Sequence, residues 1–364
     1  MRIPGVRRIL APPRRVRTFC LGLAIAVIYG CGEEPVRGLP RAITPVEAGG
    51  VKFLDRDFDS IVVTGARVEK VATGFTFIEG PVWRVDGGPH LLFSDLRGNA
   101  LYRWEPSGEL VVIAVPFSSV GRAGNVGPNG LTLDPRGRLV ICESGDRRIT
   151  RLNGGERTVL ADRYQGKRLN SPNDLAYRSD GSLYFTDPPY GLPREDEDPE
   201  KELSVNGVYR LAPDGELRLL DGRLHRPNGI AFSPDERTLY VANSQPDRHV
   251  VLAFPVETDG ALGQARVFFE FPSRREPDRP DGIKVDVSGN VYVAATHGVW
   301  VFDRSAKPLG MILPDERPAN IAWGDDGRTL YITASSSLYR IALKIRGVFP
   351  EPGLGAAREP LGSR

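Results

Sequence analysis

Six copies of a short sequence unit place an oxygen-bearing side chain at the same position in five of them. That shared position is occupied, in chain order, by Glu79, Asn129, Asn173, Asn228, Asp281 and Ala319. Carboxylate and amide oxygens without histidine or cysteine form a donor set for a hard cation, and Ca²⁺ tolerates ligands from separate parts of a fold. Mg²⁺ demands stricter octahedral geometry, and Zn²⁺ favours nitrogen or sulfur. These residue types predict a divalent-cation site, with Ca²⁺ favoured and Mg²⁺, Mn²⁺ and Zn²⁺ as alternatives.

A competing interpretation of the shared position is local turn formation. In several copies glycine follows, and Asn, Asp and Gly all accept the left-handed backbone conformations that tight turns need. Two carboxylates at one position, Glu79 and Asp281, have no basic residue there to balance them. Because converging carboxylates require a counter-charge, the cation site is the preferred interpretation.

Short strands must bring these residues together. The clearest copies of the unit span residues 128–141, 172–185, 227–241 and 280–293. Each copy is typical of strand, turn and strand, and a third strand follows; repetition at roughly 40–55 residues indicates a propeller blade. The sequence predicts an all-β fold, a six-bladed β-propeller of four-stranded blades around a central channel, closed by a strand from residues 61–75. The first strand of each blade is innermost, so we expect the shared position at one mouth of the channel.

Composition and charge agree with one large domain that does not bind nucleic acid. The chain has 364 residues with 41 glycines and 31 prolines, which suits many strands joined by turns. Its net charge of +2 conceals an asymmetry, because six of the 48 basic residues lie in residues 1–30, where no acidic residue occurs. The remainder is slightly acidic and offers no basic face for nucleic acid. We expect the propeller to span residues 61–349, followed by a flexible tail at 350–364.

The N-terminal segment is typical of an export signal. Basic residues precede an apolar run that is too short to span a bilayer. Residues 28–31 (Ile-Tyr-Gly-Cys) resemble a bacterial lipobox, in which Cys31 is acylated after cleavage. We therefore expect a lipoprotein-type signal peptide at 1–30, a tether at 31–60, and a protein at the periplasmic face of a membrane or in the cell envelope, held only by its lipid. Ordinary cleavage and a cytoplasmic protein with an apolar arm are the alternatives, and both the Sec and twin-arginine routes stay open.

Several motifs around the shared position resemble those of a known family. They are Glu-Gly-Pro-Val-Trp at 79–83, Asn-Ser-Pro-Asn-Asp at 170–174, Phe-Thr-Asp-Pro-Pro-Tyr-Gly at 185–191, Arg-Pro-Asn-Gly at 226–229 and Arg-Pro-Asp-Gly at 279–282. In this order they resemble the gluconolactonase/SMP-30/luciferin-regenerating-enzyme family. The resemblance implies a six-bladed propeller that hydrolyses sugar lactones and related esters with one divalent cation in its central channel.

The resemblance also implies roles for single residues. The family's metal ligands correspond to Glu79, Asn173, Asn228 and Asp281. Asn129 stands where relatives contact substrate or complete the metal shell. Some members carry a substrate-binding arginine at the position of Ser171, and here the neighbouring arginine is Arg168.

The chemistry expected of this site is the opening of a lactone ring. A cation beside the carbonyl would act as a Lewis acid, and a nearby base must take a proton from the attacking water. Asp281 is the first candidate for that base, with Asp187 and His297 as alternatives. The candidates for substrate binding at the channel mouth are Asn129, Arg168, Tyr190 and Asn320.

Two other functions would use the same residues differently. One is metal-dependent hydrolysis of another ester, such as an aryl ester, or of an organophosphate. The other is a non-catalytic sugar-binding propeller that keeps the cation for structure. The expected partner is a small-molecule lactone or ester, and we expect a monomer.

Three further features are local. The insertion at 192–206 is either a solvated acidic loop or a lid over the channel mouth. Cys142 lies in an alternating apolar run, which indicates a buried, unreactive thiol. The histidines outside the shared position, His90, His225 and His249, are interpreted as structural or surface residues.

Overall fold

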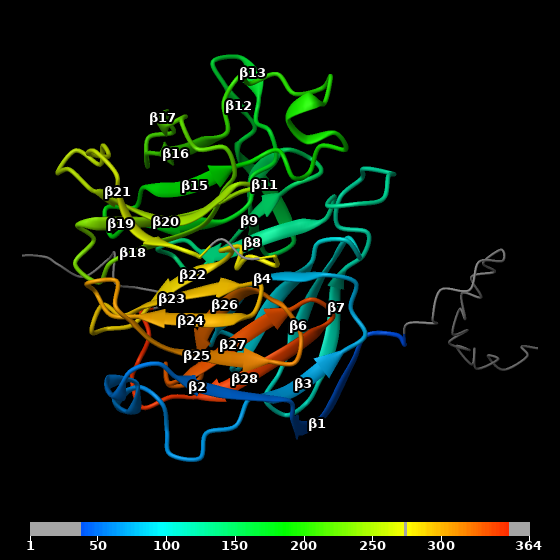
Figure 1. Cartoon of the computed structure of the whole chain (residues 1–364). Helices are drawn as coiled ribbons and strands as arrows, with labels where there is room; N and C mark the ends of the chain where they lie inside the picture. The colour runs from blue at the N-terminus through cyan, green and yellow to red at the C-terminus, as the bar shows by residue number, and fades with distance from the viewer. Residues whose placement is uncertain (1–37, 273–274, 349–364) are drawn as a thin grey trace, which may run out of the picture. The chain divides into compact units, whose positions relative to one another are not determined.

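The computed structural model describes residues 38–272 and 275–348, in which the regular structure is almost entirely β-strand (Figure 1). The predicted signal peptide at 1–30, the lipidation site Cys31 and the tail at 350–364 lie outside the described residues. Within the described part, no helix is long and apolar enough to cross a membrane.

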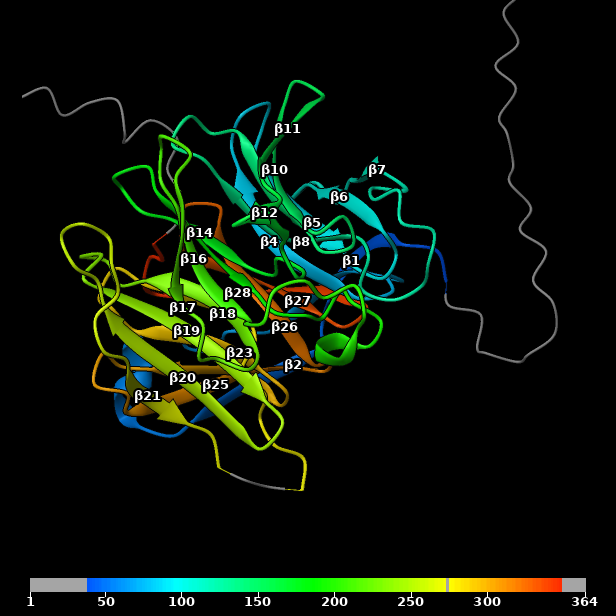
Figure 2. The same cartoon turned by 90° about the horizontal axis from the view of Figure 1, so that it is seen from above.

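Six antiparallel sheets form the blades of a β-propeller, as the sequence predicts (Figures 1 and 2). Blade 1 contains β4 (Ile78–Arg84), β5 (His90–Asp95), β6 (Ala100–Trp104) and β7 (Leu110–Ala114). Blade 2 contains β8 (Pro128–Leu133), β9 (Leu139–Glu143), β10 (Arg148–Asn153) and β11 (Glu156–Ala161). Blade 3 contains β14 (Leu175–Tyr177), β15 (Leu183–Asp187), β16 (Gly207–Leu211) and β17 (Leu217–Asp221).

The remaining blades follow in chain order. Blade 4 contains β18 (Pro227–Phe232), β19 (Thr238–Gln245), β20 (Arg248–Pro255) and β21 (Arg266–Glu270). Blade 5 contains β22 (Ile283–Val285), β23 (Val291–Ala295), β24 (Gly298–Phe302) and β25 (Pro308–Pro314). Blade 6 contains β26 (Pro318–Gly324), β27 (Thr329–Ala334), β28 (Ser337–Ala342) and β3 (Glu69–Thr73). A small hairpin, β12 (Arg163–Tyr164) and β13 (Lys167–Arg168), lies between blades 2 and 3 in the chain.

The first strands of the blades contact one another around a closed ring. β4 contacts β8, β8 contacts β14, and the series continues through β18, β22 and β26 back to β4. Figure 1 shows β4, β22 and β26 close together near the middle of the view. Residues that begin these strands therefore share one end of the central channel.

Blade 6 is closed by a strand from the opposite end of the chain. β3 pairs antiparallel with β28, with Thr73 opposite Ser337 and Glu69 opposite Arg340. The prediction that residues 61–75 supply the closing strand is confirmed. Glu316 reinforces this closure, because its carboxylate accepts hydrogen bonds from Lys70 of β3 and from Ser337 of β28.

The predicted tether at 31–60 is wrong over much of its length. β1 (Arg41–Glu47) pairs with β3, and β2 (Gly49–Phe53) pairs with β25, so each adds a fifth strand to a blade. The 3₁₀ helix η1 (Arg56–Ser60) then buries Phe58 against Gly310. Outer strands leave unpaired backbone groups, which these segments satisfy. The folded unit therefore begins well before residue 61.

Aromatic side chains fill the space between neighbouring blades. Trp83 of blade 1 stacks on Tyr331 of blade 6, with ring centroids 5.3 Å apart. Tyr184 of blade 3 meets the ring of Phe232 in blade 4 edge-on at 4.9 Å. Cys142 is fully buried in this core, and burial raises the pKa of its thiol well above its ordinary value, as expected for an unreactive cysteine.

Candidate active site

The shared position lies at the entry to the innermost strand of every blade. Glu79, Asn129, Asn228 and Ala319 are the second residues of β4, β8, β18 and β26, and Asn173 and Asp281 lie two residues before β14 and β22. All six are buried, with at most 7% of their surface exposed. The closed ring of first strands gathers them at one end of the channel, and we call these six residues the mouth ring.

Glycine follows the mouth-ring residue in four blades because neighbouring blades approach too closely for a Cβ atom. These glycines are Gly80, Gly130, Gly229 and Gly282. A Cβ on Gly80 would lie 2.0 Å from the carbonyl oxygen of Asn129, and one on Gly229 would lie 2.1 Å from that of Asp281. Gly80 alone among the four has a positive φ, of 48°. The turn interpretation is therefore wrong for the other three, where close backbone approach is what requires glycine.

Hydroxyl groups near the ends of the second strands fasten each of four blades to the next. They belong to Ser94, Ser144, Thr186 and Ser244. Ser94 Oγ donates a hydrogen bond to the Asn129 carbonyl at 2.7 Å, and Thr186 Oγ1 donates to the Asn228 carbonyl at 2.7 Å. Sequence analysis overlooked these residues, although a Ser or Thr recurs there in successive copies of the unit.

The two carboxylates of the mouth ring lie in an environment that disfavours their charge. Burial raises the pKa of Glu79 well above its ordinary value, and the charges of Asp281 and Asp174 raise it further. Burial also raises the pKa of Asp281 to about 7, while Arg317 opposes the shift from an Nη2–Oδ2 distance of 3.6 Å. The ring is therefore short of positive charge.

Asp174 is a third buried carboxylate, and sequence analysis did not single it out. It follows Asn173 directly, at the place that glycine takes in four other blades, and it is 2% exposed. Its Oδ2 accepts a hydrogen bond from Asn320 Nδ2 at 3.4 Å. Burial raises the pKa of Asp174, and Lys284 opposes that shift. The replacement of the usual glycine by Asp was the signal that could have identified it.

The donor set of the mouth ring fits a hard divalent cation. Two carboxylates, of Glu79 and Asp281, and two amides, of Asn173 and Asn228, offer oxygen atoms of the kind that Ca²⁺ prefers. In the described part of the chain, no group of three or more His, Cys, Asp or Glu residues is arranged to hold a metal. The mouth ring is not a group of that kind, because two of its four candidate metal ligands are asparagine amides. A dication would offset the repulsion among the buried carboxylates.

Asp187 positions the segment that leads into Asn173. Its Oδ2 accepts the backbone N–H of Asn170 and its Oδ1 accepts that of Ser171, both at 2.7 Å, and the residue is fully buried. Burial raises the pKa of Asp187 to about 7, and the two backbone hydrogen bonds oppose that shift. Both carboxylate oxygens are thus engaged with the chain itself.

His297 lies on the turn between β23 and β24 and pairs with Asp278. The imidazole Nδ1 is 3.0 Å from Asp278 Oδ1, and the backbone N–H of His297 donates to the same oxygen. Asp281 N–H donates to the Ala294 carbonyl, three residues before His297 in the chain. His297 is therefore tied to Asp278, a buried carboxylate three residues before Asp281 in the chain.

Three of the four predicted substrate-binding residues lie at the mouth ring. Asn129 belongs to the ring, and its amide lies 3.4 Å from Ser144 Oγ. Asn320 follows Ala319 and forms a hydrogen bond that favours the charged form of Glu79. Burial raises the pKa of Tyr190, and the charge of Asp281 raises it further.

Arg168 lies outside the mouth ring. Its Nη2 donates a hydrogen bond to the carbonyl of Asp146 at 3.0 Å, and its backbone N–H donates to Glu202 at 2.8 Å. The guanidinium is therefore tied to the turn after β9, on the same side of the propeller as the ring.

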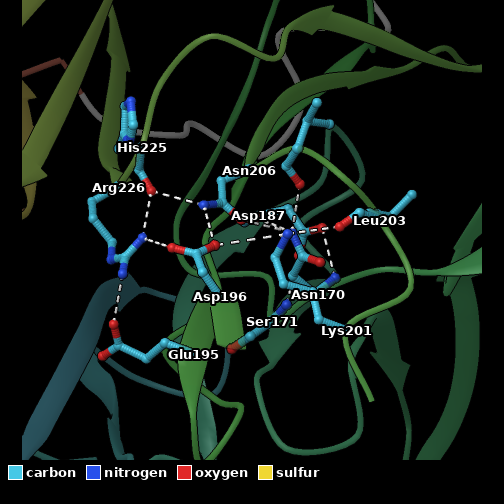
Figure 3. A network of polar contacts seen from close by, with 11 residues as sticks. Asn170, Ser171, Asp187, Glu195, Asp196, Lys201, Leu203, Asn206, His225 and Arg226 are labelled. Carbon is cyan, nitrogen blue, oxygen red and sulfur yellow. Dashed lines mark hydrogen bonds and ion pairs between the residues drawn. The ribbon is translucent and has the colours of Figure 1, made fainter. Parts of the chain in front are cut away.

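The insertion at 192–206 is fastened to the body of the propeller by a polar network (Figure 3). It carries the second 3₁₀ helix, η2 (Glu195–Glu197). Arg226, two residues before Asn228, donates to Glu195 at 2.8 Å and also to Asp196. The acidic side chains of the insertion, Asp198 excepted, are exposed to solvent, while ion pairs and the buried Leu203 and Asn206 hold the segment in place.

The other end of this loop is tied to the segment before Asn173. Asn170 Nδ2 donates to Asn206 Oδ1 at 3.1 Å, and Asn206 Nδ2 donates to Asp196 at 2.9 Å (Figure 3). Leu203 is buried against blade 3. A cavity of about 500 Å³ opens beside the loop, lined by residues such as Lys201 and His225 but by none of the mouth ring.

The chain is similar to known proteins over most of its length. Residues 77–336 match the family model described as SMP-30/Gluconolactonase/LRE-like region. A gluconolactonase from Zymomonas mobilis is 36% identical over 310 residues, which cover 81% of this chain and 86% of that protein. The solved structure of a gluconolactonase from Xanthomonas campestris has a TM-score of 0.73 at 35% identity, covering 83% of this chain and 98% of that one. A calcium-binding regucalcin from Agrobacterium tumefaciens, with a TM-score of 0.61 at 20% identity over 76% of this chain and 93% of its own, shares the fold.

Proposed function

Since the chain belongs to the SMP-30/gluconolactonase/LRE-like family, as its motifs predict, and its gluconolactonase relatives support a lactone-hydrolysing enzyme, we propose that it opens a sugar lactone with the help of a divalent cation, Ca²⁺ in the first instance. The observation that carries the proposal is the convergence of two carboxylates and two amides in a buried ring with too little positive charge. A buried cluster of this composition is costly unless a cation balances it.

The residues that would hold the cation are Glu79, Asn173, Asn228 and Asp281. When bound, the cation supplies a Lewis acid for the lactone carbonyl. Each ligand stands at the entry of a different blade, and the inter-blade contacts at Gly80, Gly229 and their neighbours hold these entries at fixed spacing. This pre-organisation reduces the rearrangement needed to bind a metal and substrate.

The proposed reaction adds one water to the lactone. The water oxygen bonds to the carbonyl carbon, the ring carbon–oxygen bond breaks, and the former ring oxygen takes a proton to become a hydroxyl. The products are a hydroxy acid in its carboxylate form and one proton. Asp281 would accept the proton of the attacking water, because a carboxylate that holds the cation through one oxygen keeps its second oxygen for that proton.

Other residues at the mouth would orient the sugar. The amides of Asn129 and Asn320 and the hydroxyl of Tyr190 offer both donors and acceptors for sugar hydroxyls. Arg168, which is tied to Asp146, and His297, which is paired with Asp278, would meet a larger substituent on the lactone. Asp187 would act on the reaction only by positioning Asn170 and Ser171, next to the ligand Asn173.

We also propose that the protein is exported and anchored through a lipid on Cys31. The lipobox-like residues at 28–31 support this location. Metabolic labelling with a radioactive fatty acid tests it: label on the chain and its loss in Cys31→Ser support the anchor, and an unlabelled chain refutes it.

The proposed activity is tested by stripping the protein with chelator and adding back Ca²⁺, Mg²⁺, Mn²⁺ or Zn²⁺ one at a time. Hydrolysis of D-glucono-1,5-lactone, other sugar and aliphatic lactones, aryl esters and an organophosphate is then measured. We expect lactone opening to be lost after stripping, restored by Ca²⁺, and abolished by Glu79→Gln. Glu109→Gln is the matched control, because Glu109 is an exposed carboxylate in the same blade.

The other outcomes assign a different function. Turnover restored only on aryl esters or the organophosphate would replace the lactone with that substrate class. Tight Ca²⁺ binding without turnover of any ester would indicate a sugar-binding propeller. Full activity after stripping would refute the metal dependence.

A further inference from the structure

Arg317 stands at the one side of the mouth ring that lacks an oxygen-bearing side chain. It precedes Pro318 and Ala319, and Ala319 is the mouth-ring residue of blade 6. From there it reaches toward blade 5, where its Nη2 lies 3.6 Å from Asp281 Oδ2. Its side chain is 40% exposed, whereas that of Asp281 is 10% exposed. The guanidinium therefore faces both the ring and solvent.

The backbone that carries Arg317 is held firmly. The preceding residue, Glu316, accepts hydrogen bonds from Lys70 Nζ at 3.1 Å, from Ser336 N–H at 2.8 Å and from Tyr339 O–H at 3.1 Å. The carbonyl of Arg317 itself accepts a hydrogen bond from Ser335 Oγ. These contacts join the strands that close the propeller, so the arginine starts from a fixed point at the mouth.

The N–H groups of the Arg317 guanidinium are available to bind a ligand. A separation of 3.6 Å is attractive between opposite charges but too long for a good hydrogen bond. Within the described residues, Arg317 makes no other side-chain ion pair or hydrogen bond. Five N–H donors in a planar fork are thus available beside the carboxylate that we propose as a metal ligand and base.

We propose that Arg317 binds the carboxylate of the hydroxy acid that ring opening produces. This inference rests on the proposed lactone hydrolysis. The new carbon–oxygen bond from water and the broken ring bond leave two oxygens on the former carbonyl carbon, sharing one negative charge. One oxygen would face the ligands of the cation, and the other would face the Arg317 fork across the gap at Ala319.

Binding of the product and support of the fold predict different changes in affinity when the charge of Arg317 is removed. A positive charge 3.6 Å from a metal ligand opposes the binding of a cation in the ring, whereas it attracts an anionic product. Removing the charge should therefore strengthen Ca²⁺ binding and weaken binding of the hydroxy acid. A residue that merely supported the fold of the ring would weaken both on removal.

The experiment measures both affinities by calorimetry in the full-length protein and in Arg317→Gln and Arg317→Lys. Ca²⁺ is titrated into chelator-stripped protein, and gluconate is titrated into the stripped and the Ca²⁺-loaded protein. A charge-assisted hydrogen bond contributes roughly 10- to 100-fold in affinity, so we expect Arg317→Gln to lose about that much gluconate binding. Ca²⁺ should bind Arg317→Gln more tightly than the unmodified protein. Arg317→Lys should keep part of the gluconate affinity, because it keeps the charge without the fork.

Arg304→Gln is the matched control, since Arg304 is an exposed arginine on blade 5 that donates to the Ser288 carbonyl, and its substitution should leave both affinities unchanged. Unchanged gluconate affinity in Arg317→Gln would overturn the proposal, and so would a parallel loss of Ca²⁺ and gluconate binding. The proposed function has a separate readout: an unmodified protein that opens no lactone refutes it, whatever the gluconate affinities are.

Discussion

Gly229 of blade 4 lies against the backbone of Asp281 in blade 5, so closely that a Cβ atom on the glycine would stand 2.1 Å from the Asp281 carbonyl oxygen. The contact joins two neighbouring positions of the mouth ring, because Asn228 directly precedes Gly229. The contact between the Gly229 and Asp281 backbones therefore sets both the spacing of blades 4 and 5 and the separation of two mouth-ring residues.

Gly229→Ala should destabilise the fold and distort the ring together. The added Cβ must push the two blades apart, and overpacking of this kind costs about 1–3 kcal/mol. We expect a lower melting temperature and weaker Ca²⁺ binding, measured by thermal unfolding and calorimetry. Gly50→Ala is the control, because a Cβ at Gly50 meets nothing within 4 Å. Equal melting temperatures for the two variants would contradict the explanation.

Ca²⁺ should stabilise the protein against heat. A ligand that binds only the folded state adds about 2.7 kcal/mol at one hundred times its dissociation constant. We expect the melting temperature of chelator-stripped protein to rise when Ca²⁺ is added, and this rise to disappear in Asp281→Asn. The stripped Asp281→Asn protein itself should remain folded, since the substitution removes one of three buried charges that repel one another. A rise that survives in Asp281→Asn would place the cation elsewhere.

Stripped protein should lose stability as the pH rises from about 4 to about 7. The folded state raises the pKa of Asp281 from 3.8 to about 7 and raises that of Glu79 in the same direction, so in this window it binds more protons than the unfolded state. The free energy of unfolding then falls with pH, at about 1.4 kcal/mol per pH unit for one fully titrating group. Chemical denaturation at several pH values measures this slope. Asp281→Asn should show a shallower slope, and a slope that rises toward pH 7 would refute the assignment.

Arg226→Gln should release the loop at 192–206. Arg226 is the cation that pairs with both Glu195 and Asp196, and only 14% of its side chain is exposed. We expect faster tryptic cleavage at Arg194 and Lys201 and a severalfold higher KM for the lactone, because the loop begins next to Tyr190. Arg218→Gln removes an exposed ion pair with Glu216 and is the control. Identical cleavage rates in the two variants would show that this ion pair does not hold the loop.

The repeat was sufficient to predict the fold and the residues of the ring. The strands and turns of one propeller blade are formed by one continuous stretch of sequence. Six similar stretches therefore predict six similar blades. Aligning the copies places Glu79, Asn173, Asn228 and Asp281 at equivalent points. Equivalent points in a closed array of blades must converge on the central axis, which is why positions about fifty residues apart could be assigned to one site.

The strand that closes blade 6 could be predicted, because a ring of blades must close on itself. The strands β1 and β2 could not be predicted in this way. Their residues follow no repeat, and their pairing with β3 and β25 depends on which sheet edges the finished propeller leaves open. Asp174 was missed for a related reason. Its importance comes from the charges of Glu79 and Asp281, which lie near it only after the blades have closed.

The amino-acid pattern alone was enough to establish the blade number, the ring and the chemical type of its donors, because each follows from residue identity and local spacing. Whether a given side chain faces the site depended on contacts between distant segments. Those contacts turned Asp187 toward the backbone of Asn170 and Ser171, paired His297 with Asp278, and brought Arg317 within 3.6 Å of Asp281. Burial and charge are properties of the assembled ring, so the raised pKa of Asp281 and the unused donors of Arg317 arise only when the six blades come together.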